Sequence, residues 1–511
     1  MLLVVVVAAV FVVCDGFTFS SHNRFVNRLL TMNNDNELEK VTIIGGGFGG
    51  LYTALKVAKQ ANNSIDVTLI DNKDRFVFLP LLYELAIGTA SVLEVAPQFK
   101  ELLSNTDVNF KQGTVTNIDL ASNTLNITNS NGDSEAMNFG QIVLATGAAP
   151  RVDIINGAKE YALPFYNVDD AYKLKSKLRK LKTSHKRIPR IAVVGGGYSG
   201  VEVACCVSEY LGINSCSVSI IDRNDKIMHT SPEHNQKSAE ERLLNLGVSI
   251  NVNTSVKNIK QHSIELLPSP SATTTTTSTS SSTGNTGNTH NEDESFIMNT
   301  DLVVLTAGME PNKLIQQLKL PKDVRSGRLV VDRTLRCHHT DTTSTLDDDH
   351  SDDKIASAVI WAIGDCASID GEQVPSTAQA AMQQADILSA NLITTARTPT
   401  PTDSNTITTI DGQLMRSDKL KEFSFVPLGE MLTLGSLDAS ITGLGGLFKL
   451  SGPVASFTRR AVYALRMPTS QQRIKAATTG GLLGALTLLK KGAAMLPSPS
   501  TTSNSDVDVK E

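Results

Sequence analysis

The chain has 511 residues, which is enough for two or three domains with separate hydrophobic cores. Its composition, 41% hydrophobic and 19% charged, is that of an ordinary globular enzyme, and a net charge of −5 argues against a nucleic-acid-binding protein. The six cysteines include no C-x-x-C or C-x4-C pair, so we expect buried or unreactive thiols and no dithiol redox motif.

The first 36 residues have the character of a targeting presequence. Residues 2–14 form an apolar run with the length of a signal-peptide core, although a positively charged start is missing. Residues 17–32 begin with Phe17 and contain arginine, serine, threonine and asparagine but no acid, as transit peptides do. This combination resembles the two-part presequence of algae with complex plastids and predicts a plastid address. Secretion, an N-terminal anchor and a mitochondrial address are the alternatives.

Residues 40–71 predict a strand–turn–helix–strand unit that binds a dinucleotide. A β-branched run enters a glycine-rich turn, a helical stretch follows at 51–60, and an apolar strand at 66–71 ends on an acid. In the G-x-G-x-x-G pattern one glycine makes the tight turn, one lets a pyrophosphate approach the backbone, and one allows helix and strand to pack closely. The acid about 20 residues further on binds ribose hydroxyls. The expected site residues are Gly45, Gly47, Phe48, Gly49, Gly50 and Asp71.

Residues 190–222 repeat this pattern, with a second glycine turn, a helix at 201–211 and a strand at 217–222. The acid that ends this unit favours an unphosphorylated ribose and therefore NADH, whereas Arg223, which follows it, is suited to a 2′-phosphate. The choice between NADH and NADPH stays open. The expected site residues are Gly195, Gly197, Gly200 and Asp222.

Three further apolar strands end in motifs that accompany such units. They lie at 142–147, 302–308 and 359–365, and the last ends in Gly-Asp. Its glycine would let a flavin pass close to the backbone, and its acid would bind ribityl hydroxyls. The set resembles the two-dinucleotide-binding flavoproteins, in which the first unit holds FAD and the inserted second unit holds NAD(P)H. The expected contacts are Thr146, Gly147, Ala307, Gly308, Gly364 and Asp365.

Two segments have the composition of insertions. The first lies at 268–299 and is rich in serine, threonine, glycine and asparagine, and the second lies at 340–354 and is acidic. Neither can bury enough apolar area to fold alone, so we expect disordered, solvated loops.

The absence of a cysteine pair separates this chain from the disulfide reductases of the superfamily, and the lone Cys366 separates it from sulfide:quinone reductases. Four segments instead resemble type II NAD(P)H dehydrogenases, the single-subunit, FAD-dependent NAD(P)H:quinone oxidoreductases, and in particular their plastid class. The resemblance covers about residues 40–475 without the insertions. The segments are 75–88 (which begins with Arg75, an expected cofactor contact), 164–171, 377–385 and 428–435.

This resemblance implies roles for individual residues. Glu202 would lie beside the nicotinamide and flavin and relay protons toward the quinone; the alternative is a helix-start acid favoured by the helix dipole. Ala378 and Gln379 would contact the isoalloxazine, and Gln383 would line the quinone pocket. For the two glutamines the alternative is an ordinary polar position on a helix.

The C-terminal end is basic. Between residues 455 and 500 there are seven lysines and arginines and no acid, around an apolar stretch at 480–489 that is too short to span a bilayer. This pattern predicts docking on a membrane surface. The alternative is a helix that packs on the protein's own core or on a homodimer partner.

Together these features predict an α/β protein with two Rossmann-like domains, the second inserted in the first, and C-terminal membrane-docking helices. The expected function is hydride transfer from NADH or NADPH to FAD, followed by two-electron reduction of a membrane prenylquinone (plastoquinone or naphthoquinone type) without proton pumping. The expected location is a plastid membrane or lipid-particle surface. The expected segments are a presequence at 1–36, an FAD domain at 38–160 and 325–400, an NAD(P)H domain at 161–324, and a membrane-associated segment at 401–511.

Two other functions fit the same motifs. One is a flavin reductase whose acceptor is an iron–sulfur protein, and the other is a redox-sensing flavoprotein that turns over poorly with every acceptor. No metal site is expected, because the nine histidines have no ligand spacing with acids or cysteines.

Overall fold

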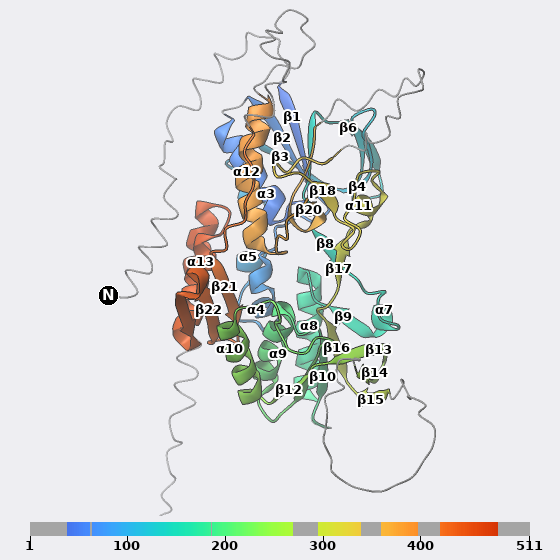
Figure 1. Cartoon of the computed structure of the whole chain (residues 1–511), viewed down its shortest axis with the longest axis vertical. Helices are drawn as coiled ribbons and strands as arrows, with labels where there is room; N and C mark the ends of the chain where they lie inside the picture. Colours follow the sequence, from blue (N-terminus) through green and yellow to red (C-terminus); the bar gives the residue numbers. More distant parts are fainter. Residues whose placement is uncertain are drawn as a thin grey trace, which may run out of the picture.

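The computed structural model describes residues 38–61, 64–184, 187–268, 295–338, 359–396 and 420–478. The expected presequence, the acidic insertion at 340–354 and the apolar stretch at 480–489 lie outside these residues. In Figure 1 the two parallel sheets follow one another along the long axis, with the N-terminal sheet above and the second sheet below.

The first sheet has five parallel strands in the order β19-β7-β1-β2-β3. Its last member, β19, comes from a segment that follows the whole second sheet in the sequence, so the first sheet is completed by a later part of the chain. Helix α3 (Phe48–Gln60) starts at the first glycine turn, and α12 (Ala378–Ala396) packs beside it (Figure 1). The strands are β1 (Glu39–Ile44), β2 (Ile65–Asp71), β3 (Val108–Gln112), β7 (Gln141–Leu144) and β19 (Ile360–Ala362).

The second sheet repeats this arrangement in the order β12-β11-β10-β16-β9, again with parallel pairing throughout. Helix α9 (Tyr198–Leu211) starts at the second glycine turn, and α8 (Val168–Thr183) and α10 (Glu233–Asn245) pack on the same unit. The strands are β9 (Ala162–Pro164), β10 (Arg190–Val194), β11 (Ser217–Ile221), β12 (Val248–Asn251) and β16 (Leu302–Leu305).

Short antiparallel sheets and single turns connect these units. They include β4 (Thr114–Asp119), β5 (Thr124–Thr128) and β6 (Ser134–Asn138), then β13 (Thr254–Lys260), β14 (Ser263–Pro268) and β15 (Phe296–Asn299), and the pair β8 (Ala148–Pro150) with β17 (Met309–Pro311). A further short pair, β18 (Leu329–Val331) with β20 (Ala367–Ile369), is parallel. The short helices are η1 (Leu79–Leu81), α4 (Leu82–Ile87), α5 (Val92–Val95), α6 (Phe99–Leu103), α7 (Ala158–Tyr161), α11 (Lys313–Gln317) and η3 (Gly364–Cys366).

Strand β15 corrects one expected boundary. The sequence assigned residues 268–299 to a disordered insertion, but β14 extends to Pro268 and Phe296–Asn299 pair with it in antiparallel register. Most side chains of β15 are exposed, so backbone hydrogen bonds to a neighbouring strand hold this edge strand in place. Amino-acid composition does not predict such a strand, because its side chains bury little apolar area.

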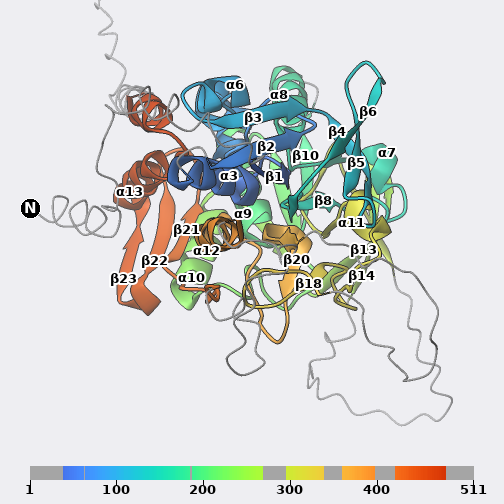
Figure 2. The same ribbon diagram turned by 90° about the horizontal axis from the view of Figure 1, so that it is seen from above.

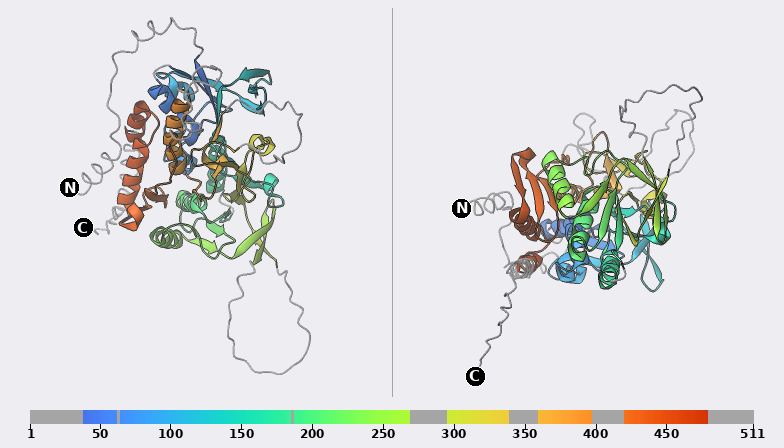
Figure 3. Two further views of the ribbon diagram at one scale, coloured as in Figure 1. Left: turned by 45° about the horizontal axis from the view of Figure 1, so that its top comes forward. Right: turned by 90° about the horizontal axis from the view of Figure 1, so that it is seen from below.

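A C-terminal unit lies at one side of the molecule, against α9 and α10 (Figure 2; right panel of Figure 3). The side-chain oxygen of Asn235 on α10 accepts hydrogen bonds from Ser440 at 2.8 Å and Thr442 at 3.0 Å, and Arg242 Nε donates to the Leu434 carbonyl at 2.9 Å. These buried polar contacts fix the unit on the second domain. It consists of β21 (Gly429–Thr433), β22 (Ala439–Gly443), η5 (Leu444–Gly446), β23 (Phe448–Ser451) and α13 (Gly452–Leu465).

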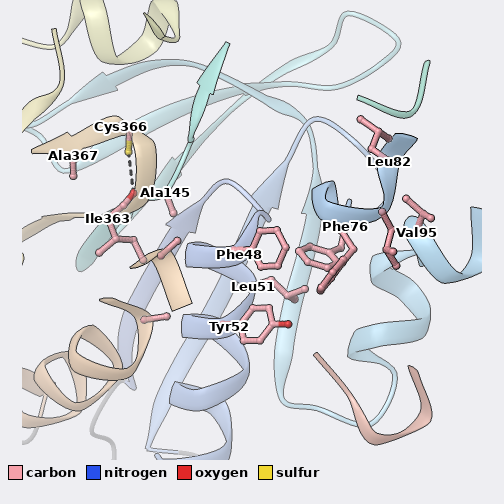
Figure 4. Packing of buried hydrophobic residues seen from close by; sticks show 14 of the residues in the cluster. Phe48, Leu51, Tyr52, Phe76, Leu82, Val95, Ala145, Ile363, Cys366 and Ala367 are labelled. Atoms are coloured by element: carbon pink, nitrogen blue, oxygen red, sulfur yellow. Dashed lines mark hydrogen bonds between the residues drawn. The ribbon is translucent and has the colours of Figure 1, made fainter. Parts of the chain in front are cut away.

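Aromatic side chains fill the core next to α3. The Phe48 ring lies 5.1 Å from Phe76 and 5.3 Å from Phe78 in edge-on contacts, and Figure 4 shows Phe48 directed at Phe76 above Leu51 and Tyr52. Tyr463 of α13 lies 5.4 Å from Phe78. The first domain and the C-terminal unit therefore share this core, and the helix after the first glycine turn is rigidly held.

Candidate functional site: two dinucleotide turns joined by a buried acid

The two glycine turns have backbone conformations that only glycine tolerates well. Gly45 has φ = +102°, and a Cβ there would lie 2.3 Å from the Ala145 carbonyl oxygen. A Cβ at Gly50 would lie 1.8 Å from the carbonyl oxygen of Gly45. By contrast, a Cβ on either Gly47 or Gly197 would meet no atom within 4 Å. Both turns therefore leave open the approach to a helix N-terminus where a pyrophosphate binds, and the residues present fit FAD and NAD(P)H.

The acid of each unit lies over its own glycine turn. Asp71 accepts hydrogen bonds from the amides of Gly46 at 2.6 Å and Lys73 at 2.8 Å. Asp222 accepts from the amides of Gly196 at 2.5 Å and Asn224 at 2.8 Å. Burial raises the pKa of Asp71, and the two backbone hydrogen bonds oppose that effect. The geometry is the same in both units, and it holds each carboxylate beside the place where a ribose meets the turn.

The other predicted residues of the first unit have packing or bridging roles in the protein itself. Phe48 belongs to the aromatic core and Gly49 lies against the Ile363 side chain. The guanidinium of Arg75 binds the Asp74 carboxylate and donates to the Ala96 carbonyl at 3.3 Å. Phe48 and Gly49 thus pack the start of α3, and Arg75 joins the segment after β2 to the segment before α6.

The strand end predicted to contact a flavin lines a cleft. The cleft is lined by Gly364 and Asp365 after β19 and by Ala381 and Gln384 of α12. Gly364 has φ = +71°, and its amide donates to the Gln384 side-chain oxygen at 2.7 Å. Burial raises the pKa of Asp365, and the charge of Arg328, which also lines the cleft, opposes that effect.

Two residues of this cleft, Gln384 and Arg328, were not selected from the sequence. Gln384 lies next to Gln383 in the segment 377–385, which the sequence already links to the flavin. The sequence could therefore have pointed to Gln384, but only the orientation of the helix shows which glutamine faces Gly364. For Arg328 the sequence gave no signal.

Thr146 and Gly147 follow β7 at the same edge of the sheet and contact Cys366. The Cys366 thiol is fully buried and donates to the carbonyls of Ile363, as Figure 4 shows, and Leu144, both at 3.2 Å. Burial raises its pKa, and hydrogen bonds from Thr146 and Gly147 oppose that effect. This cysteine is part of the packing under the strand ends.

In the second unit, Gly195 lies against the segment after β16. A Cβ on Gly195 would lie 2.9 Å from the Ala307 side chain, and Gly308 has φ = +80°. The predicted residues Gly200 and Ala307 thus belong to one close contact between the glycine turn and the next strand end, whereas Gly308 lies against Arg151 and Ile154.

Glu202 is a buried acid at the junction of three units. It lies on the second turn of α9, and its Oε1 accepts hydrogen bonds from the Thr433 amide at 3.0 Å and the Tyr83 hydroxyl at 3.1 Å. The Tyr83 and Thr433 hydroxyls lie 2.8 Å apart. Burial raises the pKa of Glu202 to about 7, although the Thr433 amide, the charge of Arg459 and the Tyr83 hydrogen bond act against it. Glu202 is therefore a protonatable group near neutral pH and is not a solvated helix-start acid.

A buried ion cluster lies beside this acid. Arg459 of α13 has no exposed surface and donates to Glu84 Oε1 at 2.5 Å, while Arg460 pairs with the other oxygen of Glu84. These two arginines were expected to be part of a basic, membrane-facing tail. The structure instead places them in the interior, where they join α13 to α4.

The predicted glutamines of α12 have different surroundings. Gln379 is partly buried at the start of the helix, next to Ala378. Gln383 makes two hydrogen bonds to the backbone of Val426, at 2.8 and 3.0 Å, so it holds the segment before β21 against α12.

No cluster of three or more metal-ligating side chains occurs among the described residues. Within that same part of the chain, no helix combines the length and apolarity needed to cross a bilayer.

Comparisons with known proteins agree with this geometry. The family model of pyridine nucleotide-disulphide oxidoreductases matches residues 39–385. Demethylphylloquinone reductase NdbB of Synechocystis is 33% identical over 85% of this chain and 94% of its own length. The alternative NAD(P)H-ubiquinone oxidoreductase C1 of Arabidopsis thaliana, described as chloroplastic/mitochondrial, is 31% identical over 86% of this chain and 80% of its own length. The structure of NDH2 from Plasmodium falciparum with NADH aligns over 87% of this chain and 98% of its own with a TM-score of 0.68, and at 21% identity this likeness concerns the fold.

Two glycine turns, an acid hydrogen-bonded to each turn and a cleft at Gly364 are the arrangement of a two-dinucleotide-binding flavoprotein. The chain belongs to the pyridine nucleotide-disulphide oxidoreductase family and, within it, to the type II NAD(P)H:quinone oxidoreductases. It is an FAD-dependent enzyme that oxidises NAD(P)H and passes two electrons to a quinone without pumping protons.

Proposed function

We propose that FAD occupies the first glycine turn and the cleft at Gly364, and that NAD(P)H occupies the second glycine turn. The single observation that carries this assignment is the cleft, because Asp365, which follows strand β19 of the first sheet, and Gln384 of α12 both line it. When bound, FAD supplies the two-electron chemistry, and the protein binds and orients both dinucleotides. The split FAD domain and the inserted NAD(P)H domain follow from this assignment.

We further propose that Glu202 provides the proton that quinone reduction consumes. Glu202 lies on α9, the helix that follows the proposed NAD(P)H turn, and its buried carboxyl accepts hydrogen bonds from Tyr83 and Thr433. A group with a pKa near neutrality can both release a proton to the acceptor and regain one from solvent. Ala378 and Gln379, at the start of α12, would contact the isoalloxazine, and Gln383 would border the quinone.

The proposed acceptor is a prenylated quinone, and a naphthoquinone is favoured. The support is the 33% identical relative, which is named a demethylphylloquinone reductase, while the Arabidopsis relative is named for ubiquinone. The chloroplastic description of the Arabidopsis relative, together with the character of residues 1–36, supports a plastid location.

We also propose that the C-terminal unit docks the enzyme on a membrane surface. Four large apolar side chains of this unit are exposed, by 68% at Leu444, 91% at Leu447, and 57% at both Val454 and Phe457. Exposed apolar groups beside basic residues are typical of proteins that bind at the lipid interface. Such docking would bring the enzyme to a quinone whose prenyl tail stays in lipid.

Stopped-flow measurement of the two half-reactions tests the proposal. NADH or NADPH is mixed with the purified FAD-loaded protein under anaerobic conditions, and a short-chain naphthoquinone is added in a second mixing step. Rapid bleaching of the flavin followed by rapid reoxidation is the expected result. Bleaching that only an iron–sulfur protein reverses, or that no acceptor reverses, would exclude the quinone assignment and point to a ferredoxin-type reductase or a redox sensor.

A further inference from the structure

The start of helix α9 is in contact with the C-terminal sheet as well as with the glycine turn. The Tyr198 hydroxyl donates a hydrogen bond to the Glu430 carboxyl on β21. One helical turn later, Glu202 accepts from the Thr433 amide on the same strand. These two contacts place β21 along the first two turns of α9, so a strand far away in sequence packs against the helix that follows the second glycine turn.

Tyr198 immediately follows Gly197, the residue that begins the helix where a pyrophosphate binds. A single tyrosine side chain therefore separates the Glu430 carboxyl from the backbone amides that would hold the phosphates. A tyrosine side chain and one hydrogen bond together span less than the Debye length of about 10 Å at 0.1 M ionic strength, so an ionised carboxylate at that reach acts on a diphosphate bound at these amides.

We propose that Glu430 is a binding-site residue for NAD(P)H whose ionised carboxylate weakens dinucleotide binding, so that NAD(P)H binds most tightly when Glu430 is protonated. The proposal rests on the proposed assignment of NAD(P)H to the second glycine turn.

The groups around Glu430 do not neutralise it. From α9 it contacts Tyr198, while Glu202, one turn further, contacts the Thr433 amide of the same strand. Its partner on β22 is Thr442, and Lys449 follows in the same cross-strand row on β23, beyond that threonine. The neighbouring η5 contributes only Leu444–Gly446. Burial raises the pKa of Glu430 to about 7, so the carboxyl changes its charge near neutral pH.

The sign of the effect follows from this pKa. Below about pH 7 the carboxyl is neutral and does not oppose the phosphates, and above it the carboxylate repels them. The dissociation constant of NADH should rise roughly three- to tenfold between about pH 6 and pH 8, as expected for charges separated by less than a Debye length. NADH is preferred to NADPH for the test because it carries no 2′-phosphate that titrates in the same range.

The experiment measures the NADH dependence of the anaerobic flavin-bleaching rate over this pH range with the full FAD-loaded protein. Glu430→Gln should keep the low dissociation constant at every pH. Tyr198→Phe retains the acid and should show the rise at higher pH, because a hydroxyl that stabilises the carboxylate is gone. Glu135→Gln removes the same charge from β6, which lies at the other end of the molecule from α9 (Figure 1), and should behave like the wild type.

If Glu430→Gln shows the same rise as the wild type, the inference is wrong, and Glu202 becomes the group that controls NADH affinity. In that case NADH still bleaches the flavin and the proposed function stands. If NADH fails to bleach the flavin of the wild-type protein at every pH, the proposed function itself fails.

Discussion

At the scale of single residues, the acids differ in what surrounds them. Asp71 and Asp222 are held by backbone amides over their glycine turns, as dinucleotide-binding acids are. Glu202 is held by Tyr83 and Thr433, and Glu84 by two arginines. The sequence identifies the first two by their spacing from glycines, whereas the environments of the other two depend on segments hundreds of residues away.

Replacing Glu202 by glutamine should slow reoxidation of the reduced flavin by quinone about 100-fold, the lower end of the range for loss of a positioned proton donor. In the wild type this step should slow as the pH rises through about 7, because the raised pKa keeps the carboxyl protonated below that value and ionised above it. The variant should show no such dependence. Double-mixing stopped flow measures the step, and a variant with the wild-type profile would show that another group delivers the proton.

Replacing Glu84 by glutamine should lower the free energy of unfolding by about 3–5 kcal/mol, because the fully buried Arg459 keeps its charge and loses its partner. Urea unfolding of the FAD-loaded protein measures the change. Glu101→Gln breaks the exposed ion pair with Lys475 and should change the stability by less than about 1 kcal/mol. Similar losses in the two variants would contradict a stabilising buried cluster.

At the scale of single elements, helix α8 has a complete capping box. The Asn167 side chain accepts from the Asp170 amide at 3.0 Å, and the Asp170 carboxylate accepts from the Asn167 amide at 3.2 Å. Reciprocal bonds of this kind satisfy two amides that a helix start otherwise leaves without partners. The remainder of the helix is an alternation of exposed lysines with buried Leu174 and Leu178.

Asn167→Ala should therefore cost about 1 kcal/mol of stability, with the kinetics of both half-reactions unchanged. Thermal unfolding followed by far-UV circular dichroism measures the loss. Ser184→Ala, at the other end of α8, where the cap is a backbone hydrogen bond, is the matched control and should have little effect. An unchanged midpoint for Asn167→Ala would falsify the capping argument.

At the scale of the whole molecule, the C-terminal unit joins the two domains. Its sheet is bonded to α9 and α10, and its helix α13 is bonded to α4 and packs on the aromatic core. The same unit carries the exposed apolar residues from Leu444 to Phe457. The contacts of this unit hold the two domains together, and its exposed apolar residues are the surface proposed to bind lipid.

The double variant Leu447→Asp/Phe457→Asp should reduce binding to vesicles that contain anionic lipid at least tenfold, since each buried apolar side chain contributes roughly 1.5–3 kcal/mol. Flavin bleaching by NADH in solution should be unaffected. Val324→Asp changes a fully exposed apolar residue outside this unit and should bind vesicles like the wild type. Co-sedimentation measures the binding, and unchanged binding of the double variant would place the lipid contact elsewhere.

The sequence by itself determined the two nucleotide-binding units, because the glycine turns and their acids are local features with fixed spacing. Gly45 and Gly195 have the positive φ values that this motif demands, and both acids lie over their turns. The split first sheet was also predictable, since the strand ending in Gly364–Asp365 has a recognisable motif. These conclusions need no knowledge of contacts between distant segments.

Only the tertiary structure decided how the C-terminal part is used. Composition does not distinguish the basic residues of this part from one another. In the structure Arg459 and Arg460 form ion pairs with the buried Glu84, whereas Lys475 pairs with Glu101 at the surface. The same holds for Gln384 facing Gly364, for β15 pairing with β14, and for Glu430 reaching Tyr198. In each case a side chain or strand has a partner that only the folded chain brings beside it, and the energy of a buried charge or hydrogen bond depends on that partner, which no sequence pattern specifies.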